Sequence, residues 1–239
     1  MPLQYIWMVW SLLLLGVWGG VFALLRSEAS RREMLIVSAW TSLFGLTEPF
    51  FVPEYWNPPS LFELAHRTGF DLESIVFTFA IAGIVSVLYE AVFPRIHERI
   101  PEHTRHEPRH RLHSWAIVSG PAVFFAVVLA TPVNPIYAVF AAAAVGGAFA
   151  IYCRPDLARK MVVSGVLFTL LYGIYFLILI ALAPGYVTSV WNLGALTGIL
   201  IVGIPLEELL FAFSIGFLWS GIYEHVRWYR FSRRMRRAP

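Results

Sequence analysis

The sequence predicts an all-α integral membrane protein with seven transmembrane helices. Hydrophobic residues make up 58% of the 239 residues and charged residues only 14%, whereas a typical soluble domain is about one quarter charged. Apolar runs of about 20 residues, the length that crosses a bilayer as a helix, recur along the chain. The basic residues gather in alternate connections between these runs, as they do in membrane proteins.

Seven apolar segments can be delimited in chain order. The first is too long for the core of a cleavable signal peptide and lacks a basic start, so we expect it to be a spanning helix. A Thr-Pro-Val-Asn-Pro turn at 131–135 divides what would otherwise be one long apolar run into two helices. The predicted spans are 4–25, 34–52, 71–93, 114–131, 134–152, 161–183 and 205–226.

The positive charges predict an orientation. All but one of the 18 Lys and Arg residues follow the first, third, fifth or seventh span, and Arg67 alone falls on the other side. Because basic loops stay on the cytoplasmic side, we expect the N-terminus outside and the C-terminus inside. The pI of about 9.2 reflects these basic residues at the inner surface. The expected partner of these residues is the lipid bilayer, and we expect no nucleic-acid partner. The sequence leaves open whether the protein forms a homo-oligomer.

One stretch of sequence occurs twice. The copy from Gly69 to Glu90 and the copy from Gly203 to Glu224 align without a gap and share Gly, Leu, Glu, Phe, Phe, Ile, Tyr and Glu at matching positions. We infer an internal duplication. Because the fourth span restores the chain direction that three spans reverse, the halves are expected to be parallel repeats joined by a linker helix. The predicted domains are the first three-helix repeat (1–93), a basic loop with linker helix four (94–132), and the second repeat with a basic tail (133–239).

Carboxylates at the outer ends of the spans are the candidate catalytic residues. Glu73 and Glu207 occupy matching positions in the first turns of their helices; Glu208 follows Glu207, and Glu48 ends the second span. An ionisable group inside a bilayer costs about 2.5–3.5 kcal/mol on insertion scales and usually serves function. A glutamate in a first helical turn can instead be a cap that favours the helix dipole.

Aromatic residues surround these acids. The candidates for substrate binding are Phe77, Phe211, Trp56, Trp191, Tyr55 and Tyr186. The Trp and Tyr residues form either an interfacial belt or a pocket whose π faces stabilise a cation. Burial helps a carboxyl group to keep its proton at neutral pH. An apolar aromatic pocket with a few acids therefore suits the protonation of an alkene and the sheltering of the resulting carbocation.

The predicted inner loop is rich in histidine. It contains His97, His103, His106, His110 and His113. Histidines at such spacing can bind a metal, but two prolines and five arginines favour a solvated segment beside anionic headgroups. Glu90 and Glu224, about 25 Å along their helices from Glu73 and Glu207, are expected to be inner-surface anchors. The single Cys153 excludes a disulfide framework. No Gly-rich dinucleotide fingerprint occurs, so we expect no cofactor and no metal.

The segment Pro205-Leu206-Glu207-Glu208, followed by Phe211, resembles a motif of the membrane-bound lycopene cyclase family of actinobacteria, archaea and fungi. In that family a Pro-x-Glu-Glu/Asp motif opens a helix, and three-span domains occur as two subunits or as one fused seven-span chain. The resemblance implies non-redox, acid-catalysed cyclisation of linear carotenoid end groups to β-type rings in a prokaryotic cell membrane.

Our hypothesis gives each acid a role in this reaction. Glu207 is the leading general acid, with Glu208 as its pKa tuner or a second acid. Glu73 and Glu48 contribute from the other half as base, second acid or hydrogen-bond partner. The first repeat departs from the family motif, because Asp71 replaces the proline and Ser74 the second acid. The two halves are therefore not expected to be chemically equivalent.

Other functions fit this sequence less well. A microbial rhodopsin needs a lysine in the last helix, whereas the only lysine here is Lys160. A transporter would carry polar residues through the whole depth of its helices. Two alternatives stay open: a membrane terpene cyclase that acts on another isoprenoid, and a non-catalytic carotenoid-binding protein.

Overall fold

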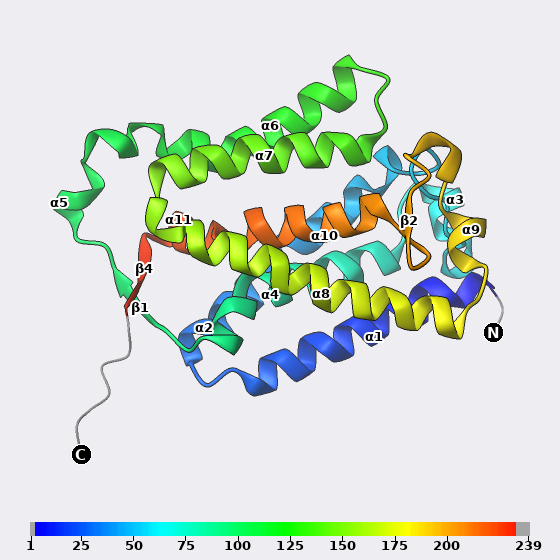
Figure 1. Ribbon diagram of the computed structural model, residues 1–239, viewed down its shortest axis with the longest axis horizontal. Coiled ribbons are helices and arrows are strands. Elements are labelled where there is room, and N and C mark those ends of the chain that lie inside the picture. Colours follow the sequence, from blue (N-terminus) through cyan, green and yellow to red (C-terminus); the bar gives the residue numbers. More distant parts are fainter. Residues whose placement is uncertain (1–2, 233–239) are drawn as a thin grey trace.

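Long helices form along the apolar runs and lie side by side (Figure 1). The computed structural model describes residues 3–232, so the arginines of the predicted basic tail beyond residue 232 lie outside the described residues. The elements are α1 (Leu3–Leu24), α2 (Glu28–Thr41), η1 (Ser42–Phe50), η2 (Leu61–Glu63), α3 (Leu64–Thr68), α4 (Leu72–Val92), β1 (Ile96–Arg99), α5 (Glu102–Arg105), η3 (Pro108–Leu112), α6 (His113–Ala130), α7 (Pro135–Cys153), η4 (Pro155–Leu157), α8 (Ala158–Leu182), α9 (Tyr186–Val190), η5 (Leu193–Ala195), β2 (Leu200–Ile201), β3 (Ile204–Pro205), α10 (Leu206–Trp219), α11 (Ile222–Arg227) and β4 (Tyr229–Ser232).

Six helical stretches within residues 3–232 are long and apolar enough to cross a membrane. They are Gln4–Leu24, Leu72–Val92, Pro108–Ala130, Pro135–Cys153, Pro155–Leu182 and Leu206–Arg227. The protein is thus an all-α chain of the membrane type, and six of the predicted spans coincide with these helices. The turn at 131–135 separates α6 from α7 as predicted, with the Asn134 side chain capping α7.

The predicted second span, 34–52, is not one regular helix. It comprises most of α2, which has 14 residues, and then η1, a nine-residue 3₁₀ helix that contains Pro49. Proline lacks the N–H that an α-helix needs in its interior, and a 3₁₀ helix rises more steeply per residue than an α-helix. The change of helix type brings the end of this segment, including Glu48, against α4.

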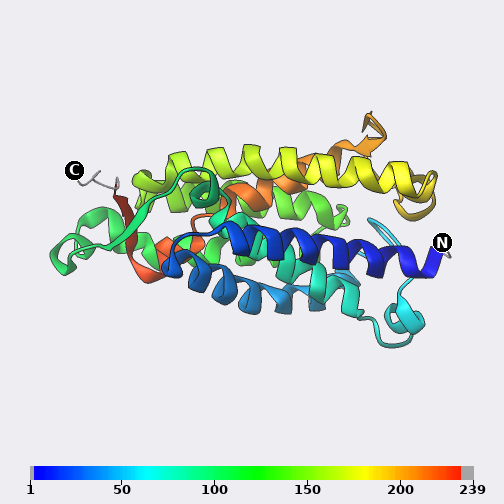
Figure 2. The same ribbon diagram turned by 90° about the horizontal axis from the view of Figure 1, so that it is seen from below.

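The helices form two groups that meet at α4 and α8 (Figures 1 and 2). In one group α4 packs on α1, α2 and η1; in the other α10 packs on α8 and α7, and α6 packs chiefly on α7. Glycines permit the closest approaches. A Cβ atom on Gly45 would lie 2.7 Å from the Ile75 Cα atom, and one on Gly216 would lie 2.9 Å from the Gly165 Cα atom. These contacts fix the position of η1 against α4 and of α10 against α8.

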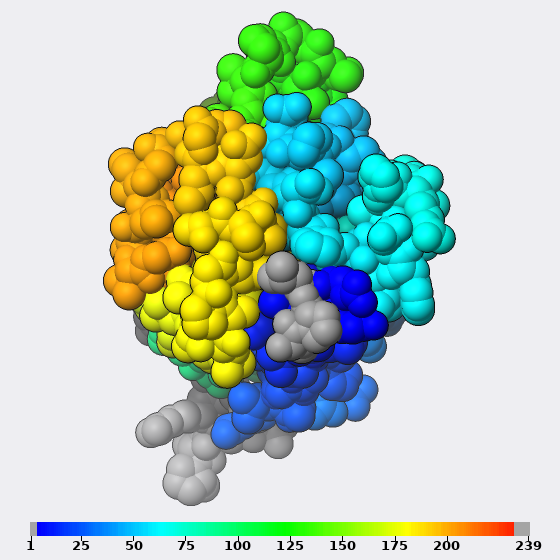
Figure 3. Space-filling view, turned by 90° about the vertical axis from the view of Figure 1, so that its right-hand side faces the viewer, coloured from blue at the N-terminus to red at the C-terminus, as the bar shows by residue number. Residues whose placement is uncertain are grey.

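The loops before α4 and α10 meet at one end of the bundle (Figure 3). Trp56 and Trp191 form an antiparallel β-bridge there. The Asn57 N–H donates to the Val190 carbonyl at 2.8 Å, and the Asn192 N–H donates to the Tyr55 carbonyl at 3.0 Å. We call this the tryptophan-bridge end. The opposite end is closed by β1 and β4, which pair antiparallel, and we call it the β1–β4 end.

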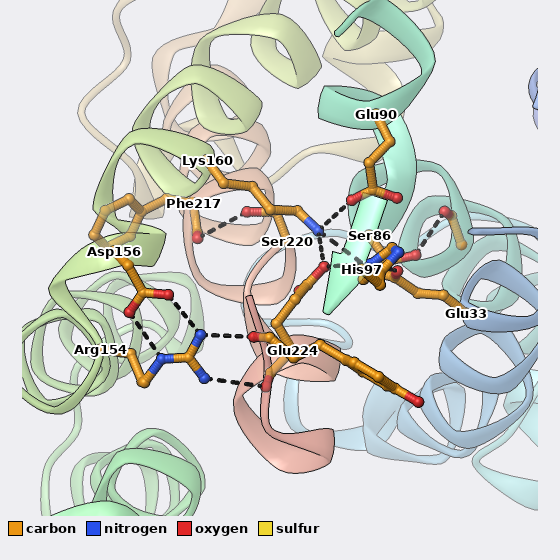
Figure 4. Close-up of polar contacts among 12 residues, drawn as sticks. Glu33, Ser86, Glu90, His97, Arg154, Asp156, Lys160, Phe217, Ser220 and Glu224 are labelled. Carbon is orange, nitrogen blue, oxygen red and sulfur yellow. Dashed lines mark hydrogen bonds and ion pairs between the residues drawn. The ribbon is translucent and has the colours of Figure 1, made fainter. Parts of the chain in front are cut away.

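A buried ionic cluster lies near the β1–β4 end (Figure 4). The Lys160 Nζ atom is 2.7 Å from a carboxylate oxygen of Glu90, 2.7 Å from one of Glu224 and 3.4 Å from one of Glu33. The His97 Nε2 atom lies 3.2 Å from both Glu33 and Glu224. We call these five residues the Lys160 cluster.

The Lys160 cluster corrects three predictions. Glu90 and Glu224 are not surface anchors, and His97 is not part of a solvated loop, because all three side chains are at most 4% exposed. Charges removed from water need partners, and these residues supply them to one another. Burial disfavours the charged imidazole, but hydrogen bonds to Glu224 and Glu33 outweigh burial and raise the pKa of His97 to about 10.

Candidate functional site

A cavity of about 230 Å³ lies between the two groups of helices, towards the tryptophan-bridge end. Its walls come from α1, η1, α4, α6, α7, α8 and α10 and from the two bridged loops, and they are mostly aromatic and aliphatic. Among the described residues that line it, Glu48 and Glu208 are the only carboxylates. One comes from each predicted half of the chain.

Glu208 is buried, with 4% of its surface exposed, and accepts three hydrogen bonds. Tyr55 and Trp191 donate to its Oε1 atom, the Trp191 indole at 2.8 Å, and Tyr172 donates to its Oε2 atom at 2.8 Å. All three donors are neutral, and within residues 3–232 Glu208 makes no ion pair. Burial, followed by the charge of Glu208, raises the pKa of Tyr55 well above its usual value, so this hydroxyl remains a donor.

Three separate elements bring the donors to Glu208. Tyr55 and Trp191 come from the two loops that the β-bridge joins, and Tyr172 comes from the middle of α8. Pro205 precedes the first residue of α10, a place where proline is well tolerated because the N–H of the first helical turn has no partner in the helix. Glu208 therefore lies in the first turn of α10 and within reach of both loops.

Glu48 is buried in a different environment. It comes from η1, is 8% exposed, and lines the cavity. Its Oε1 atom is buried and has no hydrogen-bond partner among the described residues. Buried polar atoms normally have a partner. The cavity thus holds one carboxyl group with three donors and one with an unpartnered oxygen.

Glu73 and Glu207, the matched pair of the repeat, do not line the cavity. The Glu73 Oε1 atom accepts a hydrogen bond from the Leu61 N–H at 2.6 Å. The Glu207 Oε1 atom accepts from the Thr197 N–H at 2.8 Å and from the Tyr137 hydroxyl at 3.1 Å. Each glutamate therefore holds the loop that precedes its own helix, which is the structural alternative considered for residues in a first turn.

All six aromatic residues predicted for substrate binding line the cavity: Phe77, Phe211, Trp56, Trp191, Tyr55 and Tyr186. The four Trp and Tyr side chains are at most 8% exposed, which favours the pocket over the interfacial belt. The ring centroids of Trp56 and Trp191 are 5.3 Å apart, and the Tyr172 ring lies 6.4 Å from Phe77 and 6.2 Å from Phe211.

The sequence reasoning missed several residues of the cavity wall, above all Tyr172 and Tyr175 on α8 and Trp7 and Trp10 on α1. A signal for the tyrosines was present. They lie in the middle of an apolar span, where a buried hydroxyl needs a partner. Tyr172 finds it in Glu208, and Tyr175 donates to the Trp10 carbonyl at 2.8 Å.

The histidines of the predicted inner loop separate into two groups. His103 and His106 are exposed, as a solvated loop predicts. His110 is 7% exposed and its Nδ1 atom lies 3.2 Å from the Cys153 sulfur, so for His110 the solvated-loop prediction is wrong. The reason is that η3 leads directly into α6 and packs against α7, whose last residue is Cys153.

Comparison with protein families gives one match. Residues 134–226 match the family described as lycopene cyclase. This segment contains α7, α8 and α10, and with them Glu208 and two of its donors, Tyr172 and Trp191. No curated protein and no solved structure matches the chain. Segment 134–226 is thus similar to the lycopene cyclase family.

Proposed function

We propose that the protein is a lycopene cyclase that converts the linear end group of a carotenoid to a β-type ring. The observation that carries this proposal is the arrangement around Glu208: a carboxyl group buried in an aromatic cavity, with three neutral donors and no cation. An isoprenoid end group is apolar, and its cyclisation needs only a proton donor, a proton acceptor and shelter for a cation.

The proposed reaction begins with Glu48 as the proton donor. A carboxylate with an unpartnered oxygen in an apolar site is costly, so such a group holds its proton. Glu48 protonates the terminal double bond of the substrate, which leaves a tertiary carbocation. The electrons of a neighbouring double bond then close the six-membered ring and move the positive charge onto the ring.

Glu208 acts in the second half of the reaction. Burial disfavours the ionised form of both acids, but only Glu208 has three donors that favour it. Of the two acids, Glu208 is therefore the one whose ionised form is better stabilised. Its carboxylate faces the cationic ring and accepts the proton whose loss forms the ring double bond. One proton enters and one leaves, so the product is an isomer of the substrate and no oxidant is needed.

The aromatic wall stabilises the cation between these steps. A cation over an aromatic face gains about 0.5–2 kcal/mol, more when water is excluded. The rings of Phe77, Phe211 and Tyr172 form one such group, and those of Trp56 and Trp191 form another. In this scheme Glu207 and Glu73 position the outer loops and do not touch the substrate.

The cavity suits one end of a long polyene. Its volume of about 230 Å³ is below the roughly 300–1,000 Å³ of pockets that enclose a whole drug-sized ligand. Phe44 on η1 and Phe125 on α6 both line the cavity, and both are exposed, by 43% and 41%. We place the entrance between them, so that the substrate enters sideways from the bilayer and the remainder of the chain stays in lipid.

The proposal includes the membrane arrangement inferred from the sequence. Segment α2–η1 is the second of seven spans, the N-terminus is outside, and the tryptophan-bridge end faces outwards in a prokaryotic cell membrane. The two halves are parallel repeats. Support comes from paired features, since Glu73 and Glu207 each hold the loop before their helix, and Trp56 and Trp191 pair across the halves.

Expression in a bacterium that accumulates lycopene tests the function. Chromatography of the pigments is expected to show one- or two-ring carotenes with the wild-type protein. Glu48→Gln should abolish them, and Glu54→Gln, a change at an exposed acid just after η1, should not. Unchanged lycopene with the protein confirmed in the membrane would contradict the proposal. Lycopene that co-purifies unaltered would instead indicate a carotenoid-binding role.

A further inference from the structure

A second group of chemically active side chains lies near the β1–β4 end, apart from the cavity. Cys153, the last residue of α7, is fully buried. The His110 Nδ1 atom lies 3.2 Å and the His113 Nδ1 atom 3.6 Å from its sulfur. One ligand atom from each of the three residues lies within 4.8 Å of every other. We call these three residues the Cys153 cluster.

These separations match those around a tetrahedral metal ion. Zinc bonds of about 2.3 Å to sulfur and about 2.0–2.1 Å to nitrogen, at tetrahedral angles, place the sulfur and each nitrogen about 3.5 Å apart. We propose that the Cys153 cluster binds Zn²⁺ or a similar borderline-soft dication through the Cys153 Sγ, His110 Nδ1 and His113 Nδ1 atoms.

Hydrogen bonding alone does not satisfy this group. The thiol can donate its proton to one imidazole and accept from the other, but the buried His110 Nε2 atom has no hydrogen-bond partner among residues 3–232. His225 stacks on His113 with ring centroids 4.3 Å apart, and neither of its nitrogens has a hydrogen-bond partner among residues 3–232. Buried polar groups without partners often indicate an ion or a water molecule that completes the site. Water can fill the fourth position of the ion.

The charges nearby do not oppose a cation. A thiolate with two neutral imidazoles carries one negative charge, which suits a dication in a buried place. The two neighbouring guanidinium groups are both engaged: Arg109 pairs with Glu107 at 2.8 Å, and Arg154 pairs with Asp156 at 2.6 Å.

The Lys160 cluster does not compete as a metal site. The acids Glu33, Glu90 and Glu224, with His97, are also close enough together to hold an ion. However, the Lys160 ammonium lies 2.7 Å from both Glu90 and Glu224 and so occupies the position that an ion would take. The Cys153 cluster contains no such internal cation.

A metal at the Cys153 cluster would join the start of α6 to the end of α7. Helix α6 packs chiefly on α7 and is the least buried of the six candidate spans. Further along α6, Phe124 and Phe125 line the cavity. We therefore expect the ion to be structural and to hold in place the helix that forms one side of the entrance.

Cobalt(II) titration of the purified full-length protein, in detergent and without a polyhistidine tag, tests the site. We expect one equivalent to bind with a sulfur-to-cobalt charge-transfer band and the intense visible bands of a tetrahedral ion, and Zn²⁺ to displace it. Cys153 is the only cysteine in the sequence, so that band reports this site alone. Cobalt binding without the band, or no binding above the detergent control, would overturn the proposal.

Variants separate the site from adventitious binding. Cys153→Ser should remove the charge-transfer band, and His113→Ala should weaken binding by about tenfold or more. His106→Ala, a change at an exposed histidine of the same loop, should leave both unchanged. Zn²⁺ should raise the apparent Tm of the wild type and not that of Cys153→Ser. An equal loss of affinity in His106→Ala and His113→Ala would contradict the assignment.

Discussion

The cavity around Glu208 and the Lys160 cluster both bury carboxyl groups inside an apolar bundle, and they do so by opposite means. Around Glu208 every donor is neutral: two phenols and an indole. In the Lys160 cluster three carboxylates share one ammonium and one imidazole. A carboxyl group held by neutral donors can exchange a proton without leaving a buried charge unpaired. A carboxylate held by a buried cation cannot, because the cation would lose its partner. Under the proposed function, the same residue type thus serves chemistry at one place and stability at the other.

Removing the charge of Glu208 should have the largest effect. Glu208→Gln is expected to lower cyclase activity by at least about 10²-fold, the lower end of the loss when a proton-transfer group is removed, because glutamine cannot accept a proton from the ring. The pigment assay measures this. Glu207→Gln is the matched control, since its side chain holds a loop outside the cavity. A Glu207→Gln protein that folds but is as inactive as Glu208→Gln would break the distinction between the two neighbours.

Removing the ammonium of Lys160 should lower the stability of the fold and should not act on the reaction itself. Lys160→Met leaves three buried carboxylates with one imidazole, and breaking a buried pair in this way costs about 3–5 kcal/mol. Thermal unfolding in detergent should show a much lower Tm, and the additional change Glu90→Gln should restore part of it. Arg159→Met, at the exposed neighbouring cation, should change the Tm little. A Lys160→Met protein of normal stability would show that the cluster is not ionic.

The pH dependence of stability should report His97. Its pKa is raised from 6.5 to about 10 in the folded protein, so the folded state binds the proton more tightly than the unfolded state. The stability that this provides is complete below about pH 6.5 and is lost as pH rises towards 10. Unfolding measured from pH 6 to 10 should therefore show a falling Tm. His97→Gln should flatten this slope, and His103→Gln should leave it unchanged; equal slopes in all three proteins would refute the ionic role of His97.

Removing one donor from Glu208 should have the smallest effect. Tyr172→Phe deletes one of three hydrogen bonds, which is worth about 1.5–3 kcal/mol when the acceptor is charged, so activity should fall by roughly tenfold to a hundredfold. Tyr175→Phe removes a hydroxyl of the same wall that donates to a carbonyl and not to the acid, and it should lower activity much less. Equal losses in the two variants would point to packing and not to the hydrogen bond.

The hydropathy of the sequence predicted most of the fold, because a bilayer leaves the chain few alternatives. Six of the predicted spans appear as long apolar helices. The form of the second span was not predictable from its apolar content, since the 3₁₀ geometry of η1 follows from Pro49 and from the contact of Gly45 with α4. Hydropathy predicts the length of a spanning segment, whereas the type of helix depends on the residues that pack against that segment.

The candidate site was predicted less completely. The motif drew attention to Glu207 and Glu208 together, but it did not say which side chain faces the cavity. Adjacent residues on a helix point about 100° apart, and in a first turn the preceding loop decides between them. Here the Thr197 N–H holds Glu207. Long-range contacts were equally hidden: Lys160 was counted among the basic loop residues, and His110 reaches Cys153 only because α7 packs along η3 and α6.

The β-bridge between Trp56 and Trp191 has a consequence for how the candidate site is assembled. Tyr55, on one side of the bridge, donates to an acid whose own helix lies on the other side. Neither half of the chain carries a full set of donors for Glu208. If the chain were cut between α6 and α7, each fragment would hold only part of the site, and activity would return only as the fragments reassembled. The turnover of such a split protein would then measure the association of its halves.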